Sequence, residues 1–141
     1  MVRTAWLYGA QGKSFVATML GRARAASPVR VVDDQRGQPT WTADVARQIR
    51  ALVTARAPAG VYHATSSGEV TWFGLAREVY TLAGANPALV SPVTSDAYPR
   101  PAPRPAYSVL GHDAWAAAGI KPIGDWRGTP GRARPASPRS V

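Results

Sequence analysis

Short apolar stretches alternate with helical segments along this chain, and this alternation constrains its fold more than any other feature. The stretches Val2–Tyr8, Val29–Val32 and Val61–Ala64 are rich in branched or aromatic residues, and turn-forming or polar residues follow each one. Apolar residues recur at helical spacing between them, so we expect helices over residues 14–24, 42–57 and 71–84. Alternating strands and helices predict an α/β fold with parallel strand pairing.

Local signals predict how these elements begin, end and pack. Thr42 and Thr71 are candidate N-caps, and Ser14 or Lys13 is expected near the cap of the first helix. The apolar stripe of the second helix is predicted from residues at helical spacing: Val45, Ile49, Leu52 and Val53. Trp72 has the spacing of a core residue in the third helix. We also expect an edge strand over 89–93, an extended segment over 98–105 and a short helix over 114–118.

The length of 141 residues suits one domain. No stretch approaches the roughly 20 apolar residues that a membrane span needs, and the first residues lack the apolar run of a secretory signal. Because the chain has no cysteine, disulfides and thiolate metal sites are excluded. These features favour a cytoplasmic protein without a membrane partner.

The net charge of +9 is the feature most typical of a nucleic-acid-binding protein. Four of the excess positive charges come from arginines after Trp126, in a segment without a carboxylate. The other basic residues are spread among eight acids and form no block. We therefore predict a domain over residues 1–126, a disordered basic tail over 127–141, and no nucleic-acid partner.

The segment from Val32 to Asp44, VDDQRGQPTWTAD, has the polar and turn-forming residues of a loop that holds a hydroxyl-rich ligand. Of the neighbours Asp33 and Asp34, one is expected to cap or orient this loop. Trp6 lies towards the C-terminal end of the first predicted strand, close to a glycine turn, at the sheet edge where α/β proteins bind ligands. The alternative is a core tryptophan, which is the usual role in a buried strand. Arg104 lies between two prolines, and a guanidinium on a stiff backbone suits a phosphate contact, with an exposed arginine as the alternative.

Several catalytic motifs are absent from the sequence. The segment from Gly9 to Ser14 lacks the first glycine of a P-loop, because Leu7 occupies that position. Nothing fits the dinucleotide fingerprint G-x-G-x-x-G, and no tyrosine precedes a lysine by four residues. His63 and His112 have no further histidine or cysteine at ligand spacing, so we predict no metal site and a packed, backbone-bonded His63. No catalytic residue is predicted in this chain.

The chain resembles the C-terminal half of the dTDP-4-dehydrorhamnose reductases, which belong to the extended short-chain dehydrogenase/reductase superfamily. Five blocks carry the resemblance, and they occur in the family's order: RTAWLYG, KSFVATML, VVDDQRGQPTWTADVA, GVYHATSSGEVTWFGLAREVY and AYPRPAPRPAYSVL. The resemblance implies a partial Rossmann-like fold, made of the C-terminal strands and helices plus a small substrate-binding subdomain.

The family reduces dTDP-4-dehydro-L-rhamnose to dTDP-L-rhamnose with NADPH or NADH and often uses magnesium. By resemblance, the residues expected to bind the dTDP-deoxysugar substrate are Trp6, Gln35, Gly37, Pro39, Thr40 and Arg104. Trp6 matches the tryptophan that contacts the deoxysugar, and Arg104 matches the arginine of an Arg-Pro motif.

The family's cofactor loop and its Tyr-x-x-x-Lys pair have no counterpart in this sequence. The resemblance therefore implies the substrate-binding portion of a reductase, truncated or split from its catalytic half and inactive alone. A separate N-terminal Rossmann half is the expected partner, and a homodimer is compatible with this interpretation. The alternatives are a non-functional remnant and, less favoured, a basic nucleic-acid-binding module.

Overall fold

The computed structural model describes residues 1–99 and 101–128. The strands are short, and most pair in parallel across long sequence separations. They are β1 (Val2–Arg3), β2 (Leu7–Tyr8), β3 (Val29–Val32), β4 (Arg36–Gly37), β5 (Thr40–Trp41), β6 (Tyr62–His63), β7 (Val70–Thr71) and β8 (Val90–Val93). The parallel pairs are β1 with β6, β2 with β5 and β3 with β8, and the pair β4 with β7 is antiparallel. The predicted α/β class with parallel pairing is confirmed.

Helices follow the strands in the predicted order. The α-helices are α1 (Phe15–Arg24), α2 (Thr42–Thr54), α3 (Trp72–Leu82) and α4 (Asp113–Ala117), and the 3-10 helices are η1 (Pro87–Leu89), η2 (Ser95–Ala97) and η3 (Trp126–Gly128). Ser14 caps α1 by accepting from the Ala17 N–H, and Thr71 caps α3 by accepting from the Gly74 N–H. Thr42 is not the N-cap of α2, since the helix begins at Thr42 and Trp41 precedes it without a side-chain cap.

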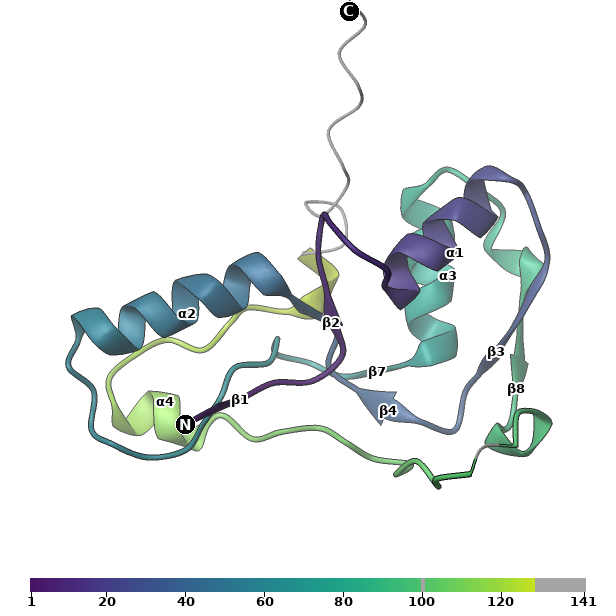
Figure 1. Ribbon diagram of the computed structural model, residues 1–141. Coiled ribbons are helices and arrows are strands. Elements are labelled where there is room, and N and C mark those ends of the chain that lie inside the picture. Colours follow the sequence, from purple (N-terminus) through teal and green to yellow (C-terminus); the bar gives the residue numbers. More distant parts are fainter. Residues whose placement is uncertain (100, 129–141) are drawn as a thin grey trace, which may run out of the picture.

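Figure 1 shows two lobes joined by β2, β4 and β7. One lobe contains α2, α4 and β1, and the other contains α1, α3 and the long pair β3–β8. Each lobe has its own apolar core. The larger core centres on Leu75, Val79 and Tyr80 of α3, and the smaller one contains Tyr62, Ala64, Trp115 and Ile123.

The first predicted strand is interrupted. Residues 2–8 form β1 and β2 with a break between them, and in the break Trp6 adopts a φ of 49°. A non-glycine residue in this left-handed region costs about 1–3 kcal/mol and persists only where its surroundings hold it. β1 and β2 consequently pair with different partners.

The predicted apolar stripe of α2 is partly wrong. Val45 and Leu52 pack against the smaller core, but Ile49 and Val53 are 43% and 72% exposed. Asp44 and Gln48 are the buried residues of α2, and the Gln48 Nε2 donates to the Lys121 carbonyl at 2.8 Å. The inward face of α2 is therefore centred on the 44, 48 and 52 positions, one residue away from the predicted stripe.

The remaining predictions at the C-terminal end are largely confirmed. β8 forms within the predicted edge segment, α4 lies at the predicted short helix, and Gly119 follows it with a φ of 67°. Of the predicted tail, residues 127 and 128 belong to η3, and residues 129–141 lie outside the described residues.

Candidate ligand-binding cleft

A cleft of about 650 Å³ lies in the larger lobe, where the chain leaves β3 and β8. Apolar and aromatic side chains from three elements contribute to its wall: Phe15, Met19, Val31 and Trp72. The segment after β8 contributes Tyr98, Pro99, Ala102 and Pro103. Its polar lining residues are Arg30, Gln35, Ser95, Asp96 and Arg104. Apolar walls with a few convergent polar groups are typical of small-molecule sites.

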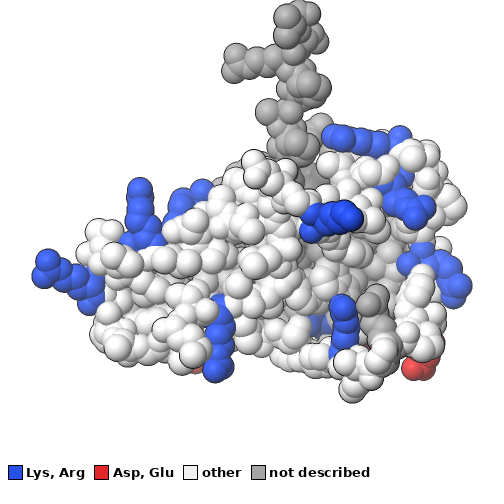
Figure 2. Space-filling view, in the orientation of Figure 1, with Lys and Arg blue, Asp and Glu red and all other residues white. Residues whose placement is uncertain are grey.

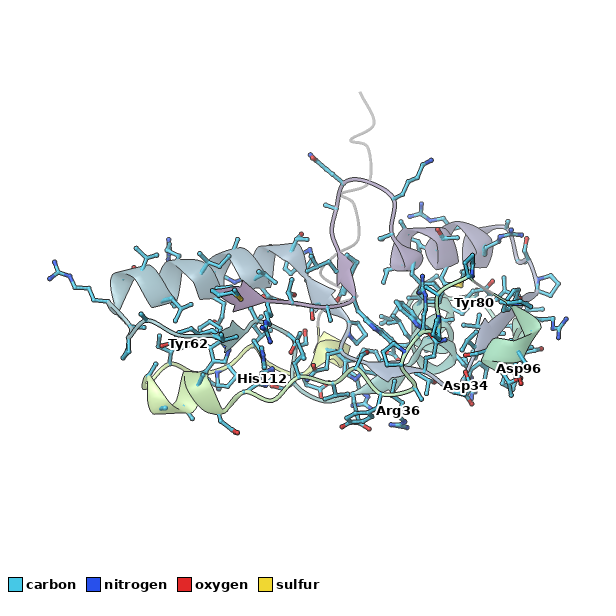
Figure 3. All side chains as sticks on the ribbon, turned by 60° about the horizontal axis from the view of Figure 1, so that its bottom comes forward. Asp34, Arg36, Tyr62, Tyr80, Asp96 and His112 are labelled. Carbon is cyan, nitrogen blue, oxygen red and sulfur yellow. The ribbon has the colours of Figure 1, made fainter. Side chains whose placement is uncertain are left out.

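Hydrogen bonds between the ends of β3 and β8 shape this cleft. The Asp34 carboxylate accepts from the Ser95 N–H at 2.8 Å and from the Ser95 hydroxyl at 2.7 Å. These two bonds hold the pKa of Asp34 below its ordinary value. The Tyr98 hydroxyl donates to the Arg30 carbonyl at 3.2 Å. Asp34 therefore orients the loop, as predicted for one of the two neighbouring aspartates, and Figure 3 shows Asp34 and Asp96 on the same side of the molecule.

Two of the predicted ligand-binding residues, Gln35 and Arg104, line the cleft. Trp6 does not line it. The Trp6 ring is stacked on Trp72, with ring centroids 3.5 Å apart and an interplanar angle of 7°, and Trp72 does line the cleft. The prediction that Trp72 is a core residue is confirmed only in part: Trp72 packs against the larger core, but it is half-buried and also contributes to the cleft wall.

The rest of the predicted loop is buried. A Cβ on Gly37 would lie 2.3 Å from the Trp6 ring, so only glycine leaves room for that ring. Pro39 is fully buried, and the buried Thr40 hydroxyl donates to the Gln38 carbonyl at 2.8 Å and accepts from the Ser66 N–H at 3.2 Å. Contacts of Trp6, Gly37, Pro39 and Thr40 with a ligand stay a prediction.

Sequence reasoning missed Arg30, Ser95, Asp96 and Tyr98 as cleft residues. Ser95 follows β8 closely, and β8 pairs in parallel with β3. Carboxyl ends of parallel strands meet at one sheet edge, where ligands bind in open α/β folds. These cleft residues could have been predicted from the sequence. If the predicted 89–93 strand pairs in parallel with the 29–32 strand, the segment that follows it must lie beside the VDDQRGQPT loop.

A second polar cluster connects Arg36 of β4 with Glu69 and with Tyr107, which belongs to the segment that runs from one lobe to the other before α4. The Arg36 guanidinium donates to the Glu69 carboxylate at 2.6 Å, and the Tyr107 hydroxyl donates to the same carboxylate at 2.8 Å. The bond from Tyr107, followed by that from Arg36, lowers the pKa of Glu69, and the bond to Glu69 raises the pKa of Tyr107. None of the three residues lines the cleft.

The two histidines lie in the smaller lobe, where Figure 3 labels His112. The His63 Nδ1 is 3.0 Å from the Gly111 carbonyl, which confirms a backbone-bonded histidine. The His112 Nε2 is 2.9 Å from the Thr65 hydroxyl. Burial, and then the nearby His63, lowers the pKa of His112, while Asp113 opposes the shift.

This lowered pKa predicts a pH-dependent stability. Between pH 6.5, the ordinary value for histidine, and the lower pKa of folded His112, the unfolded chain binds a proton that the folded chain does not. The free energy of unfolding should therefore fall as the pH is lowered through this window. Urea denaturation at about pH 7.5 and about pH 5.5 measures the change. His112→Gln should show a smaller decrease, and an equal decrease would contradict the assignment to His112.

The described residues give less support to a metal site, a nucleic-acid-binding surface or a membrane-spanning helix. Within residues 1–99 and 101–128, no group of three or more His, Cys, Asp or Glu could hold a metal ion. The magnesium implied by the resemblance therefore has no support there. On the face shown in Figure 2, Lys and Arg side chains stand apart from one another and form no continuous basic patch. In the part of the chain that the structure describes, no helix has the length and apolarity needed to cross a membrane.

The parallel strand pairs and the flanking helices have the fold of Rossmann-like reductases and epimerases. The structure of dTDP-4-dehydrorhamnose reductase from Bacillus anthracis in complex with NADP matches with a TM-score of 0.86 and 33% identity, over 94% of this chain and 46% of that one. The UDP-glucose 4-epimerase of Thermus thermophilus matches with a TM-score of 0.70 at 21% identity, which supports the fold alone.

The chain belongs to the RmlD substrate binding domain family, whose model matches residues 1–132. It is 55% identical over 131 residues to the dTDP-4-dehydrorhamnose reductase of Streptomyces griseus. It is 53% identical over 127 residues to a probable dTDP-4,6-dihydroxy-2-methyloxan-3-one 4-ketoreductase of Streptomyces antibioticus. In both comparisons the match covers 90% of this chain and 43% of the relative, so the chain spans less than half the length of these proteins. The predicted family is confirmed.

Proposed function

We propose that this chain is the substrate-binding portion of a reductase of dTDP-linked 4-keto-6-deoxysugars, with dTDP-4-dehydrorhamnose as the substrate favoured by its relatives. The observation that carries the proposal is the cleft, because it combines aromatic walls with two arginines and a glutamine in a chain of the RmlD substrate binding domain family. The relatives from Streptomyces griseus, Streptomyces antibioticus and Streptomyces niveus are all named for reductions of dTDP-linked sugars or related keto compounds.

The cleft residues suit the parts of such a ligand. Arg30 and Arg104 both line the cleft, and guanidinium groups favour the bidentate oxygen geometry of phosphates. The prolines on either side of Arg104 restrict its backbone, which lowers the entropy lost on binding. Phe15, Trp72 and Tyr98 offer aromatic surface to a base or a sugar ring.

We assign no step of the hydride transfer to these residues. NADP is bound in the related Bacillus anthracis structure. The sequence of this chain contains neither G-x-G-x-x-G nor Tyr-x-x-x-Lys, so its residues do not fit a dinucleotide cofactor by either motif. A Rossmann half as the source of the cofactor and of the proton donor stays a prediction, and a homodimer stays compatible with the proposal.

Arg104→Ala tests the proposal. Calorimetric titration of the full chain with dTDP-L-rhamnose should show binding, and the variant should bind about ten- to a hundredfold more weakly because a charge-assisted contact is lost. The matched control is Arg50→Ala, which removes an equal charge from the exposed face of α2, outside the cleft.

Three results are informative. Weaker binding by Arg104→Ala alone supports the cleft as the site. Equal weakening by both variants would indicate nonspecific attraction of a basic protein for a diphosphate, with a steep dependence on salt. No binding to the unsubstituted chain would contradict the proposal and favour the remnant.

A further inference from the structure

Three residues at the end of the cleft form a directional chain of hydrogen bonds. The Asp34 carboxylate accepts from the Ser95 hydroxyl at 2.7 Å and from the Ser95 N–H at 2.8 Å. The Ser95 Oγ is also 2.8 Å from the side-chain amide nitrogen of Gln35. Gln35 and Ser95 both line the cleft.

The chemistry of the three groups determines how the Gln35 amide is oriented. An ionised carboxylate has no proton to donate, so the single hydroxyl proton of Ser95 must lie toward Asp34. The Ser95 oxygen can then only accept from Gln35, and the group facing it must be the Nε2 amide. The Oε1 atom is thereby turned away from Ser95, and no described residue donates a hydrogen bond to it.

We infer that Gln35 presents a hydrogen-bond acceptor to the cleft, that Asp34 and Ser95 are positioning residues that fix this orientation, and that the cleft therefore selects a ligand group that donates a hydrogen bond. The inference rests on the proposed function and deepens it. A dTDP-sugar offers three kinds of donor: the imide N–H of the thymine base, the 3′-hydroxyl of the deoxyribose and the hydroxyls of the deoxysugar. A site built to accept from a donor rejects a ligand that places an acceptor there, because both acceptors would lose their partners.

Asp34→Asn should reverse the donor-to-acceptor direction of the hydrogen bonds that link Gln35, Ser95 and residue 34. The new side-chain oxygen would keep the bond from the Ser95 N–H, which leaves the new amide nitrogen facing the Ser95 Oγ. Ser95 would then accept from that amide and donate to Gln35, whose own amide would turn so that Nε2 faces the cleft. A merely structural role of Asp34 predicts weaker binding of every ligand, whereas this reversal predicts a changed preference between ligands.

Paired probes measure the preference by calorimetry at neutral pH. dTDP carries a donor at N3 of its base, and 5-methyl-dCDP carries an acceptor there. If the base faces Gln35, the unsubstituted chain should bind dTDP about tenfold more tightly than 5-methyl-dCDP, and Asp34→Asn should abolish or invert that ratio. If a sugar hydroxyl faces Gln35, the base ratio should stay constant, and the extra affinity of dTDP-L-rhamnose over dTDP should fall about tenfold in the variant.

Two further variants complete the test. Asp113→Asn removes the same charge from an exposed position of α4, outside the cleft, and it should leave these affinity ratios unchanged. Ser95→Ala removes the hydroxyl that orients the Gln35 amide, so it should reduce toward one the affinity ratio of whichever probe pair reports on Gln35. It serves as the test variant if Asp34→Asn does not fold. If the deoxyribose 3′-hydroxyl faces Gln35, the preference for dTDP over 2′,3′-dideoxythymidine diphosphate should instead fall about tenfold in Asp34→Asn. Folded variants of Asp34 and Ser95 with all three ratios unaltered would overturn the inference alone. Failure of every probe to bind the unsubstituted chain would overturn the proposed function as well.

Discussion

Trp115→Ala is expected to lower the free energy of unfolding by about 3–5 kcal/mol, the usual range for truncating a large buried aromatic residue. Trp115 is 1% exposed and packs on Tyr62, with ring centroids 5.1 Å apart. Its Nε1 donates to the His63 carbonyl at 2.8 Å. The variant would remove the largest side chain of the smaller core and leave that carbonyl without its partner. Urea denaturation followed by circular dichroism measures the loss.

Trp115→Phe is the matched control for this experiment. Phenylalanine keeps an aromatic ring against Tyr62 but cannot donate to the His63 carbonyl, so its cost should be clearly smaller than that of alanine. A cost below about 1 kcal/mol for alanine would show that Trp115 does not hold the smaller lobe together.

Gly37→Ala is expected to destabilise the chain by about 1–3 kcal/mol, the usual cost of overpacking. The new Cβ would lie 2.3 Å from the Trp6 ring, and Trp6 is held between Gly37 and Trp72 in a left-handed backbone conformation. The ring cannot move away without losing its stack on Trp72. We therefore expect a reduced free energy of unfolding in urea, together with loss of the circular dichroism signal that coupled stacked indoles produce.

Gly21→Ala provides the opposite control. Gly21 lies inside α1, and a Cβ there meets nothing within 4 Å. Because alanine favours a helix interior over glycine, this variant should stabilise the chain by about 0.5–1 kcal/mol. If both glycine variants changed stability in the same direction, the close approach of Trp6 to Gly37 would not be the cause.

The cleft depends on the pairing of β3 with β8. Their parallel register runs from Val29 opposite Val90 to Val32 opposite Val93. It brings the loop after each strand to one edge, where Asp34 bonds to Ser95 across 61 residues of sequence. A shift of one residue would turn the side chains of the strand to the opposite face. The shape of the cleft is therefore a property of the sheet pairing as much as of the loop residues.

The helices illustrate what could be predicted locally. Ser14 and Thr71 cap α1 and α3 as short polar residues do wherever a helix begins, and Gly84 follows α3 with a φ of 73°. α2 illustrates the limit of this reasoning. Its apolar residues cover more than one face, and packing buried Asp44 and Gln48 while Val53 stayed exposed.

By itself, the sequence determined the α/β class, the order of the elements, the caps of α1 and α3, and the family to which the blocks belong. These features depend on residues within a few positions of one another or on motif order along the chain. Only the tertiary structure decided that Trp6 stacks on Trp72, that Thr40 and Pro39 are buried, and that Gln35 bonds to Ser95. The physical reason is that these contacts join residues far apart in sequence, and their geometry is set by strand register and by competition for buried space.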